Sequence, residues 1–201
     1  MILNQKGFTL TELLVAMVMS LIILGAARTM YTIQAHTIKA QGNQMEAQEY
    51  ARVSLDVMAR EIRNLGYFPG LTPCAPASAA DGGLVTASDT SIRIVYDTAT
   101  FPSAACSGVQ DITYTYDAGT QNILRNGQAL TDGNVTAFQL LYYPRQIGAA
   151  APAALTGAFD KSKVQRVYIS LTVKEKHADP TVGGQYDVAM NSSVDLRNRI
   201  K

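Results

Sequence analysis

The chain opens with a long apolar run that contains a single charged side chain. Residues 7–27 read GFTLTELLVAMVMSLIILGAA, and Glu12 is the only charged residue among them. A helix of about 20 apolar residues spans the hydrocarbon core of a bilayer, so the run predicts a transmembrane helix over 8–27. A carboxylate at that depth costs about 2.5–3.5 kcal/mol on insertion scales. Glu12 therefore needs a compensating partner.

The helical pattern continues beyond the apolar run. No proline occurs between residues 29 and 65. In the second half of this segment, apolar residues recur at alternating spacings of four and three, which is typical of an amphipathic helix with one apolar stripe. The stripe consists of Ala51, Leu55, Met58, Ile62 and Leu65. We expect one helix over 8–65, with Gly66 as the residue that follows its C-terminal cap and with Gly25 and Gly42 as weak points.

Strand-like segments follow the helix. They are β-branched and tyrosine-rich, with partial alternation of apolar and polar residues. The expected strands are 91–97, 111–117, 135–143, 164–174 and 185–198. The dipeptide Asn126-Gly127 suits a tight hairpin turn, and the Ala/Pro/Gly-rich stretches 69–90 and 144–160 are expected to be surface loops. One long helix followed by successive strands predicts an α+β fold in which an antiparallel sheet covers the helix stripe.

Composition and charge exclude several classes of function. The chain has 201 residues, with 17 basic and 16 acidic side chains and a net charge of +1. Such a balance gives no field that would attract nucleic acid or anionic lipid. We find no phosphate-binding loop and no catalytic constellation, and we interpret His36 and His177 as solvated side chains. We therefore expect no enzyme activity, cofactor or metal; a membrane-anchored enzyme is the competing class.

The two cysteines, Cys74 and Cys106, both lie in loop-like sequence. An apolar N-terminal segment sends the rest of the chain across a membrane, into a compartment where disulfides persist. We expect a Cys74–Cys106 disulfide, which would stabilise the fold by about 3–4 kcal/mol on the chain-entropy model. The alternative is two unrelated thiols. The pair lacks CxxC spacing and is a weak metal signal.

Three interpretations of the N-terminus compete. A secretory signal cleaved near Gly25 has a suitable cut site, but its apolar stretch would be unusually long and would have no use for Glu12. A plain single-span anchor fits the length. It also leaves Glu12 unexplained, and the basic residues on its two sides give no clear orientation. The third interpretation rests on a resemblance.

The segment KGFTLTELLVAMVMSLIILGA resembles the prepilin (class III) signal of type IV pilins and type II secretion pseudopilins. The resemblance is carried by a basic residue, Lys6, followed by Gly7, Phe8, a Thr-Leu pair, Glu12 and the apolar run. In that family a membrane-embedded prepilin peptidase cuts after the glycine on the cytoplasmic side, and the new N-terminal residue is methylated. The resemblance therefore implies cleavage between Gly7 and Phe8 and N-methylation of Phe8.

Glu12 has a physical role in this interpretation. Once Phe8 is the N-terminus, its α-amine is positive, and an i,i+4 spacing places Phe8 and Glu12 on one helix face. A carboxylate in the first turn also meets the positive end of the helix dipole. Glu12 would thus neutralise its own N-terminus. The resemblance implies a second role, pairing with the amine of a neighbouring subunit and setting the register of assembly, because a buried charge without its partner is strongly penalised.

A second segment narrows the resemblance. YARVSLDVMAREIRNLGYFPG, residues 50–70, is similar to the segment that follows the anchor in the PilW family of minor type IV pilins. The matching residues are Arg52, Leu55, Asp56, Arg60, Ile62, Arg63, Gly66 and Tyr67. The C-terminal SVDLRNRIK resembles the closing strand of that family. The PilW family is itself similar to the J-type pseudopilins of type II secretion, which share the arrangement of one helix and a sheet.

The resemblance implies an organisation and a function. It implies a pilin-like fold with a leader (1–7), a transmembrane and fibre-core helix (8–27), an amphipathic helix (28–66) and a periplasmic β-rich head (67–201). It further implies a minor pilin of the inner membrane that helps prime pilus assembly within a tip complex. Its partners would be other minor and major pilins, prepilin peptidase and the inner-membrane assembly platform. The alternatives are a type II secretion pseudopilin and a tip adhesin that binds an external ligand through residues 69–108.

Overall fold

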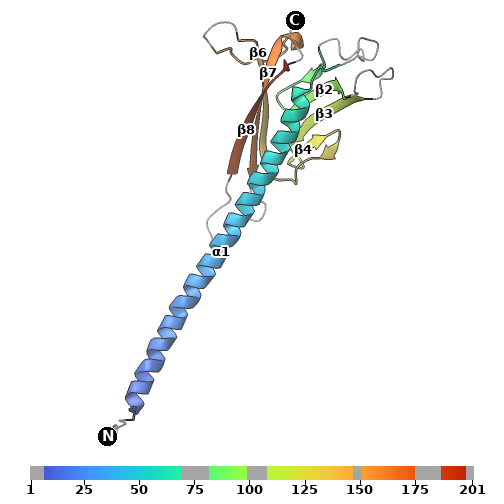
Figure 1. Cartoon of the computed structure of the whole chain (residues 1–201). Coiled ribbons are helices and arrows are strands. Elements are labelled where there is room, and N and C mark those ends of the chain that lie inside the picture. The colour runs from blue at the N-terminus through green and yellow to red at the C-terminus, as the bar shows by residue number, and fades with distance from the viewer. Residues whose placement is uncertain (1–6, 69–81, 99–107, 147–150, 175–186, 198–201) are drawn as a thin grey trace, which may run out of the picture.

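A single helix, α1 (Leu10–Arg63), dominates the computed structural model, which describes residues 7–68, 82–98, 108–146, 151–174 and 187–197. Its 54 residues correspond to a length of about 81 Å at 1.5 Å per residue. The helix carries the N-terminus far from the head, and only its last third is flanked by strands (Figure 1). Its ends lie two residues inside the expected range of 8–65.

The C-terminal end of α1 differs from the expectation in one detail. Asn64 is the C-cap, and its N–H donates to the carbonyls of Glu61 and Ile62. Leu65, rather than Gly66, is therefore the first residue after the cap. Gly66 has a positive φ of 71° and donates its N–H to the Val95 carbonyl at 3.1 Å. The glycine turns the chain away from the helix and against the edge of a strand.

Eight strands of the described residues form two antiparallel sheets. The first sheet has the order β1 (Leu84–Ala87), β2 (Ser91–Asp97), β3 (Val109–Asp117), β4 (Asn122–Arg125) and β5 (Gln128–Ala129). The second has the order β6 (Val135–Pro144), β7 (Val164–Lys174) and β8 (Asp187–Asp195). A short 3-10 helix, η2 (Lys161–Lys163), precedes β7. The predicted α+β plan, one long helix packed against antiparallel strands, is confirmed.

The structure departs from the expected sheet in two ways. The strands divide into two sheets rather than one, because β6 pairs with β7 and not with a strand of the first sheet. In addition, β1 lies in the stretch 69–90 that was expected to be a surface loop, and Leu84 within it is fully buried. The Asn126-Gly127 turn joins β4 to β5 as a hairpin, with Asn126 and Gly127 both at positive φ.

Side-chain and backbone contacts join the two sheets around the helix. The buried face of α1 begins at Ala47 and continues to Ile62, in one core cluster with residues of both sheets. Leu140 of β6 donates its N–H to the Asp89 carbonyl at 2.7 Å, next to the start of β2. The Tyr142 hydroxyl donates to the Ser88 carbonyl at 2.9 Å. The sheets therefore behave as one head, attached to the last third of α1.

The expected loop over 144–160 is partly anchored to this core. Leu155 forms an isolated bridge with Tyr142, and its N–H donates to the Tyr142 carbonyl at 2.7 Å. The rings of Tyr142 and Phe159 lie 5.2 Å apart between centroids. Alanine and proline content correctly indicated irregular backbone here. It did not reveal that Leu155 and Phe159 pack against the core.

Candidate maturation and assembly site

The described residues before α1 lie outside any helix or strand and are exposed. Gly7, Phe8 and Thr9 precede the helix, and the Phe8 side chain is 89% exposed. Thr9 is the N-cap, with an extended backbone (φ −77°, ψ 152°). The peptide bond between Gly7 and Phe8 thus lies outside the helical hydrogen bonds.

A capping box fixes the position at which the helix begins. The Glu12 N–H donates to Thr9 Oγ1 at 3.3 Å. In return, the Thr9 N–H donates to Glu12 Oε2 at 3.0 Å, and the Thr9 hydroxyl donates to the same oxygen at 3.0 Å. Such a box satisfies two backbone donors that a helix N-terminus leaves without partners. Glu12 therefore has a local partner within three residues.

This geometry changes the predicted relation between Phe8 and Glu12. The expected i,i+4 pair required Phe8 to be helical, but Phe8 lies two residues before α1 begins. In the structure the carboxylate of Glu12 accepts hydrogen bonds from Thr9. The described residues give no hydrogen bond to Glu12 Oε1. The signal was present in the sequence, because Thr9-Leu-Thr-Glu12 has the S/T-x-x-E spacing of a capping box.

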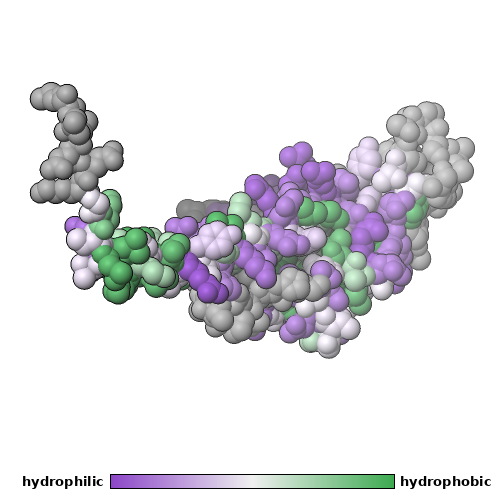
Figure 2. Space-filling model, turned by 90° about the horizontal axis from the view of Figure 1, so that it is seen from below, coloured by the Kyte–Doolittle hydropathy of each residue, from purple (hydrophilic) through white to green (hydrophobic). Residues whose placement is uncertain are grey.

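The N-terminal part of α1 has the length and composition of a membrane span. Among the described residues, α1 alone contains an 18-residue window apolar enough for such a span, with a mean hydropathy of 2.2, and none of that window is buried. Apolar side chains gather on this part of the helix, whereas the head surface is largely hydrophilic (Figure 2). This apolar segment of α1 therefore requires an apolar environment that the described residues of the subunit do not supply. We call the part of α1 before Ala47, where the buried residues begin, its free part.

A second carboxylate on α1 joins the helix to the first sheet. The Tyr114 hydroxyl of β3 donates to Glu61 Oε2. Arg125 of β4 donates from Nη2 to Glu61 Oε1 at 2.8 Å and from Nε to Oε2 at 3.2 Å. Tyr114 is fully buried, and the Glu61 side chain is only 17% exposed. We call Glu61, Tyr114 and Arg125 the helix–sheet clamp.

Electrostatics reinforces the clamp. Burial, followed by the hydrogen bond to Glu61, holds the pKa of Tyr114 far above its usual value, so the phenol stays a donor. The hydrogen bond to Glu61 also raises the pKa of Arg125. Sequence analysis missed this cluster, because Glu61 lies off the apolar stripe and its partners are 53 and 64 residues away in the chain. No local spacing indicates such a contact.

The remaining candidate residues are placed as follows. Cys74, Cys106 and His177 lie outside the described residues. His36 lies on the free part of α1 and is half-buried. Asp117, an acidic residue at the end of β3 that sequence analysis did not single out, accepts hydrogen bonds from the Gly119 N–H at 2.9 Å and the Thr120 hydroxyl at 2.7 Å, which orders the β3–β4 turn. Within the described ranges, no group of three or more His, Cys, Asp or Glu side chains could hold a metal ion.

Comparison with known proteins identifies the N-terminal segment. Residues 2–27 match the family model described as the prokaryotic N-terminal methylation motif. No curated protein matches the chain. Among solved structures, the chain is similar to a type IV-like pilin from Thermus thermophilus, with 13% sequence identity and a TM-score of 0.47, over 77% of this chain and 97% of that one. The chain thus carries a prepilin-type N-terminal methylation signal. The match to this motif is the comparison that bears on the function.

Proposed function

We propose that the chain is the precursor of a minor type IV pilin, which is anchored by α1 and assembled into a fibre after maturation. The observation that carries the proposal is the methylation motif over residues 2–27, located where an exposed, non-helical Gly7-Phe8 pair precedes a long apolar helix. Prepilin peptidase would cut between Gly7 and Phe8, and the new Phe8 amine would be methylated. The head would then lie in the periplasm.

Glu12 would act at two stages of this process. Before cleavage, its Oε2 accepts hydrogen bonds from the N–H and hydroxyl of Thr9, which lowers the cost of a carboxylate in the membrane-spanning segment. After cleavage, its other oxygen would accept the amine of a neighbouring subunit as the helices enter the fibre core. A charge that is fully compensated only beside the correct neighbour favours one register of assembly.

The minor-pilin assignment rests on the resemblance of residues 50–70 to the segment after the anchor in the PilW family. The described part of this segment, residues 50–68, forms the end of α1 and its exit, where Glu61 and Gly66 contact the first sheet. The partners would be other minor and major pilins and the inner-membrane assembly platform, and the subunit would prime assembly from the fibre tip. A type II secretion pseudopilin is the alternative assignment.

The first test is the intact mass and N-terminal residue of the protein in cell envelopes, with and without prepilin peptidase. We expect a methylated Phe8 start that depends on the peptidase. An intact Met1 or a start near Ala27 would contradict the proposal. The same mass reports the proposed Cys74–Cys106 disulfide, because its formation removes two hydrogens. Loss of pili with secretion intact in a deletion strain would support the pilin assignment, and the reverse would support the pseudopilin.

The second test removes the Glu12 carboxylate. Glu12→Ala should leave cleavage largely intact and strongly reduce incorporation into sheared fibres. Glu46→Ala is the matched control, since it removes an exposed carboxylate from the same helix outside the membrane-spanning segment. Normal incorporation of Glu12→Ala, or an equal loss in both variants, would contradict the role of Glu12 in register.

A further inference from the structure

One edge of the second sheet is long and regular. β8 pairs with β7 over all nine residues from Asp187 to Asp195, without a register shift. It forms the outer margin of its sheet (Figure 1). No described residue pairs its backbone with the other side of β8. Such an edge presents N–H and C=O groups to which a further strand can bind, and we call it the β8 edge.

The other three edges of the two described sheets are protected. On β6, the Leu140 N–H donates to the Asp89 carbonyl. The Tyr142 carbonyl of the same strand accepts the Leu155 N–H, and the register shifts near both ends of β6. β1 has four residues and a register shift, and β5 has only two residues. Short strands and bulges block pairing with another chain, and β8 has neither of these features.

The register shows which backbone groups of β8 face outward. The Leu196 N–H, just beyond the strand, donates to the Gln165 carbonyl of β7 at 2.8 Å. Residues of an antiparallel strand alternate between facing the partner strand and facing away from it. Because the register is continuous, Val194 and every second residue before it face β7. Asn191 and every second residue on either side of it therefore direct their N–H and C=O groups to the open edge.

The core is incompletely covered beside this edge. On the central strand β7, Val167, Ile169 and Leu171 are fully buried. On β8, Val188 and Met190 pack against the same core but are only partly buried. A strand added at the β8 edge would place alternate side chains beside these two residues. Apolar side chains at those positions would remove the remaining apolar surface of Val188 and Met190 from water.

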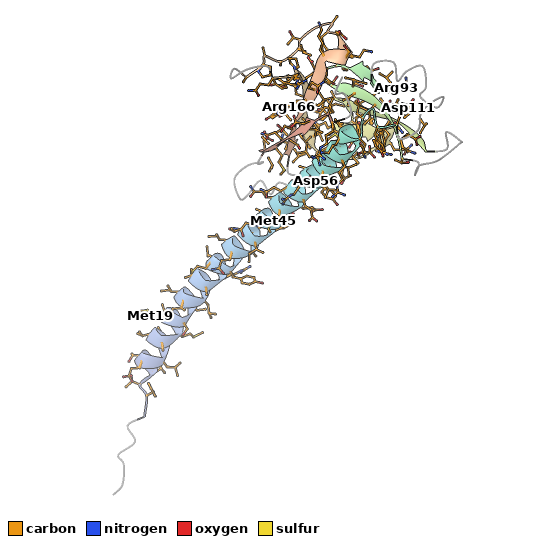
Figure 3. All side chains as sticks on the ribbon, turned by 45° about the horizontal axis from the view of Figure 1, so that its top comes forward. Met19, Met45, Asp56, Arg93, Asp111 and Arg166 are labelled. Atoms are coloured by element: carbon orange, nitrogen blue, oxygen red, sulfur yellow. The ribbon has the colours of Figure 1, made fainter. Side chains whose placement is uncertain are left out.

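The opposite face of β8 carries one carboxylate at each end. Asp187 and Asp195 are exposed, and no charged residue lies between them. β7 meets them with Lys174 and Arg166, which are directly opposite in the register. Arg166 Nε lies 2.6 Å from Asp195 Oδ1, but the Asp195 side chain is still 70% exposed. Arg166 lies on the second sheet, apart from Arg93 on the first (Figure 3), so no charge of the first sheet takes part.

The neighbouring strand β7 shows what kind of strand β8 accepts. The β7 residues that face the core are apolar and buried. The two basic residues, Arg166 and Lys174, lie eight positions apart, one opposite each carboxylate. A strand of the same pattern at the open edge would bring a second cation to each carboxylate, and opposite charges on neighbouring strands stabilise their pairing.

A second copy of β8 does not fit this edge in full register. Two antiparallel β8 strands paired over all nine residues would place Asp187 of one copy opposite Asp195 of the other, at both ends. Like charges directly opposite each other destabilise a pair of strands. The occupant that the charges favour is therefore a strand of different sequence.

We propose that the β8 edge binds an extended segment of a different protein as a fourth strand of the second sheet. The segment would run antiparallel to β8, with apolar residues toward the core and a basic residue opposite each of Asp187 and Asp195. This interaction goes beyond the proposed function, since it requires neither cleavage at Gly7 nor assembly into a fibre.

The sequence of β7 supplies the probe for a test. A fluorescent peptide of residues 164–174 has the required pattern, and a control peptide carries Arg166→Glu and Lys174→Glu. Fluorescence anisotropy measures the binding of each peptide to the purified full chain in detergent. We expect saturable binding of the first peptide. The control peptide should bind at least about fivefold more weakly, because attraction at both ends becomes repulsion.

Variants of the full chain locate the binding. Asn191→Pro removes an outward N–H, and proline is tolerated at an edge position whose N–H does not pair, so the variant should fold but lose binding. Asn191→Ala keeps the N–H and should bind normally. Asp187→Lys should weaken binding of the first peptide several-fold and strengthen that of the control peptide. Near-ultraviolet circular dichroism of the tyrosines checks the fold of each variant.

Three results would overturn the proposal. The first is equal binding of the two peptides, or no saturable binding. The second is binding that persists in Asn191→Pro, which would place the peptide elsewhere on the chain or in the position of β7. The third is self-association of the unmodified chain that Asn191→Pro removes, measured by sedimentation in detergent, because the occupant would then be a second copy. If Asn191→Pro does not fold, an unchanged peptide preference in Asp187→Lys would overturn the proposal instead.

Discussion

The two parts of α1 are one uninterrupted helix, but they are built for different surroundings. In the described residues before Ala47, no side chain of the helix is buried, and apolar side chains occur on all of its faces. After Ala47 the apolar side chains form one stripe, in which Ala51, Met58 and Ile62 are fully buried against the head. The same helical backbone therefore carries two kinds of surface. The apolar side chains of the first part have no partner among the described residues, whereas those of the second part pack against the head.

Two carboxylates of α1, Glu12 and Glu61, follow the same division. Glu12 is held by Thr9, three residues away, through one of its oxygens. Glu61 is held through both oxygens by side chains of β3 and β4. The first arrangement is local and leaves capacity for a further partner, and the second is tertiary and complete.

The largest expected effect comes from deleting core volume in the second part. Ile62→Ala should lower the free energy of unfolding by about 2–5 kcal/mol, because it removes a fully buried side chain and leaves a cavity. Ile33→Ala, in the free part, should change it by less than about 0.5 kcal/mol. Urea unfolding of the full chain in detergent, followed by near-ultraviolet circular dichroism of the tyrosines, measures both. Equal losses would contradict the division of the helix.

A glycine at the junction should have the next largest effect. Gly66 has a positive φ, and a side chain there would meet the Gly82 carbonyl oxygen at 2.4 Å. Left-handed backbone costs a non-glycine residue about 1–2 kcal/mol, and overpacking adds about 1–3 kcal/mol. Gly66→Ala should therefore destabilise the head by about 3 kcal/mol.

Gly25→Ala is the control in the free part. Gly25 is helical and has no atom within 4 Å of an added side chain, so the substitution should stabilise α1 or leave it unchanged. The same unfolding experiment reports on both variants. If Gly66→Ala retained the stability of the unmodified chain, the close approach of Gly66 to Gly82 would not be a constraint on the fold.

Local patterns explain which elements the sequence predicts well. β2 and β7 have the expected bounds. In β7 the alternation of residue types reflects one buried face, whereas β2 alternates only in its first half and is buried on both faces from Val95 to Asp97. The α1 stripe was readable for the same reason. The division into two sheets depends on long-range pairing between strands, which the periodicity of a single strand does not specify.

In the candidate site, too, contacts between residues close in sequence could be predicted, and contacts between distant residues could not. The Thr9–Glu12 capping box has a readable spacing, although only the structure revealed its use. The helix–sheet clamp has no readable spacing, because the position of β4 in the first sheet brings Arg125 to Glu61. β1 was missed because its four residues are too few to show a period. The predicted Cys74–Cys106 disulfide lies outside the described residues and stays a prediction.

The helix–sheet clamp should contribute less than the core. Glu61→Gln removes the charge that holds Arg125 and weakens the acceptor for the buried Tyr114 hydroxyl. Breaking a fully buried pair costs about 3–5 kcal/mol; because the Arg125 and Glu61 side chains are 36% and 17% exposed, solvent reduces this figure, and we expect a loss of about 2 kcal/mol. Urea unfolding of the full chain measures it.

An exposed ion pair on the head is the control for the clamp. Arg93 of β2 and Asp111 of β3 lie 2.6 Å apart between Nη2 and Oδ2, but their side chains are 43% and 44% exposed. Asp111→Asn should therefore destabilise the head much less than Glu61→Gln. If the two losses were equal, the clamp would be no more than a surface ion pair, and packing alone would attach the head to α1.

The smallest expected effect is the pH dependence of that exposed pair. The hydrogen bond from Arg93 holds the pKa of the Asp111 carboxyl below its usual range. A lowered pKa in the folded state contributes stability above the pKa of the unfolded chain, about 3.9, and this contribution disappears as the pH falls through the folded value. The stability difference between the unmodified chain and Asp111→Asn should be constant above about pH 5 and shrink below about pH 4.

The salt dependence of stability distinguishes the effect of the Arg93–Asp111 pair from that of other acidic groups that titrate in the same pH range. Screening weakens interactions between exposed charges, so 1 M salt should remove most of the difference between the unmodified chain and Asp111→Asn at pH 7. The clamp should respond less, because Glu61 and Arg125 are shielded by Tyr114 and the helix. A difference that persisted at high salt and below pH 3 would mean that Asp111 acts through packing rather than charge. In that case the smaller effect of salt on the Glu61–Arg125 pair than on the Arg93–Asp111 pair could not be attributed to the lower exposure of Glu61.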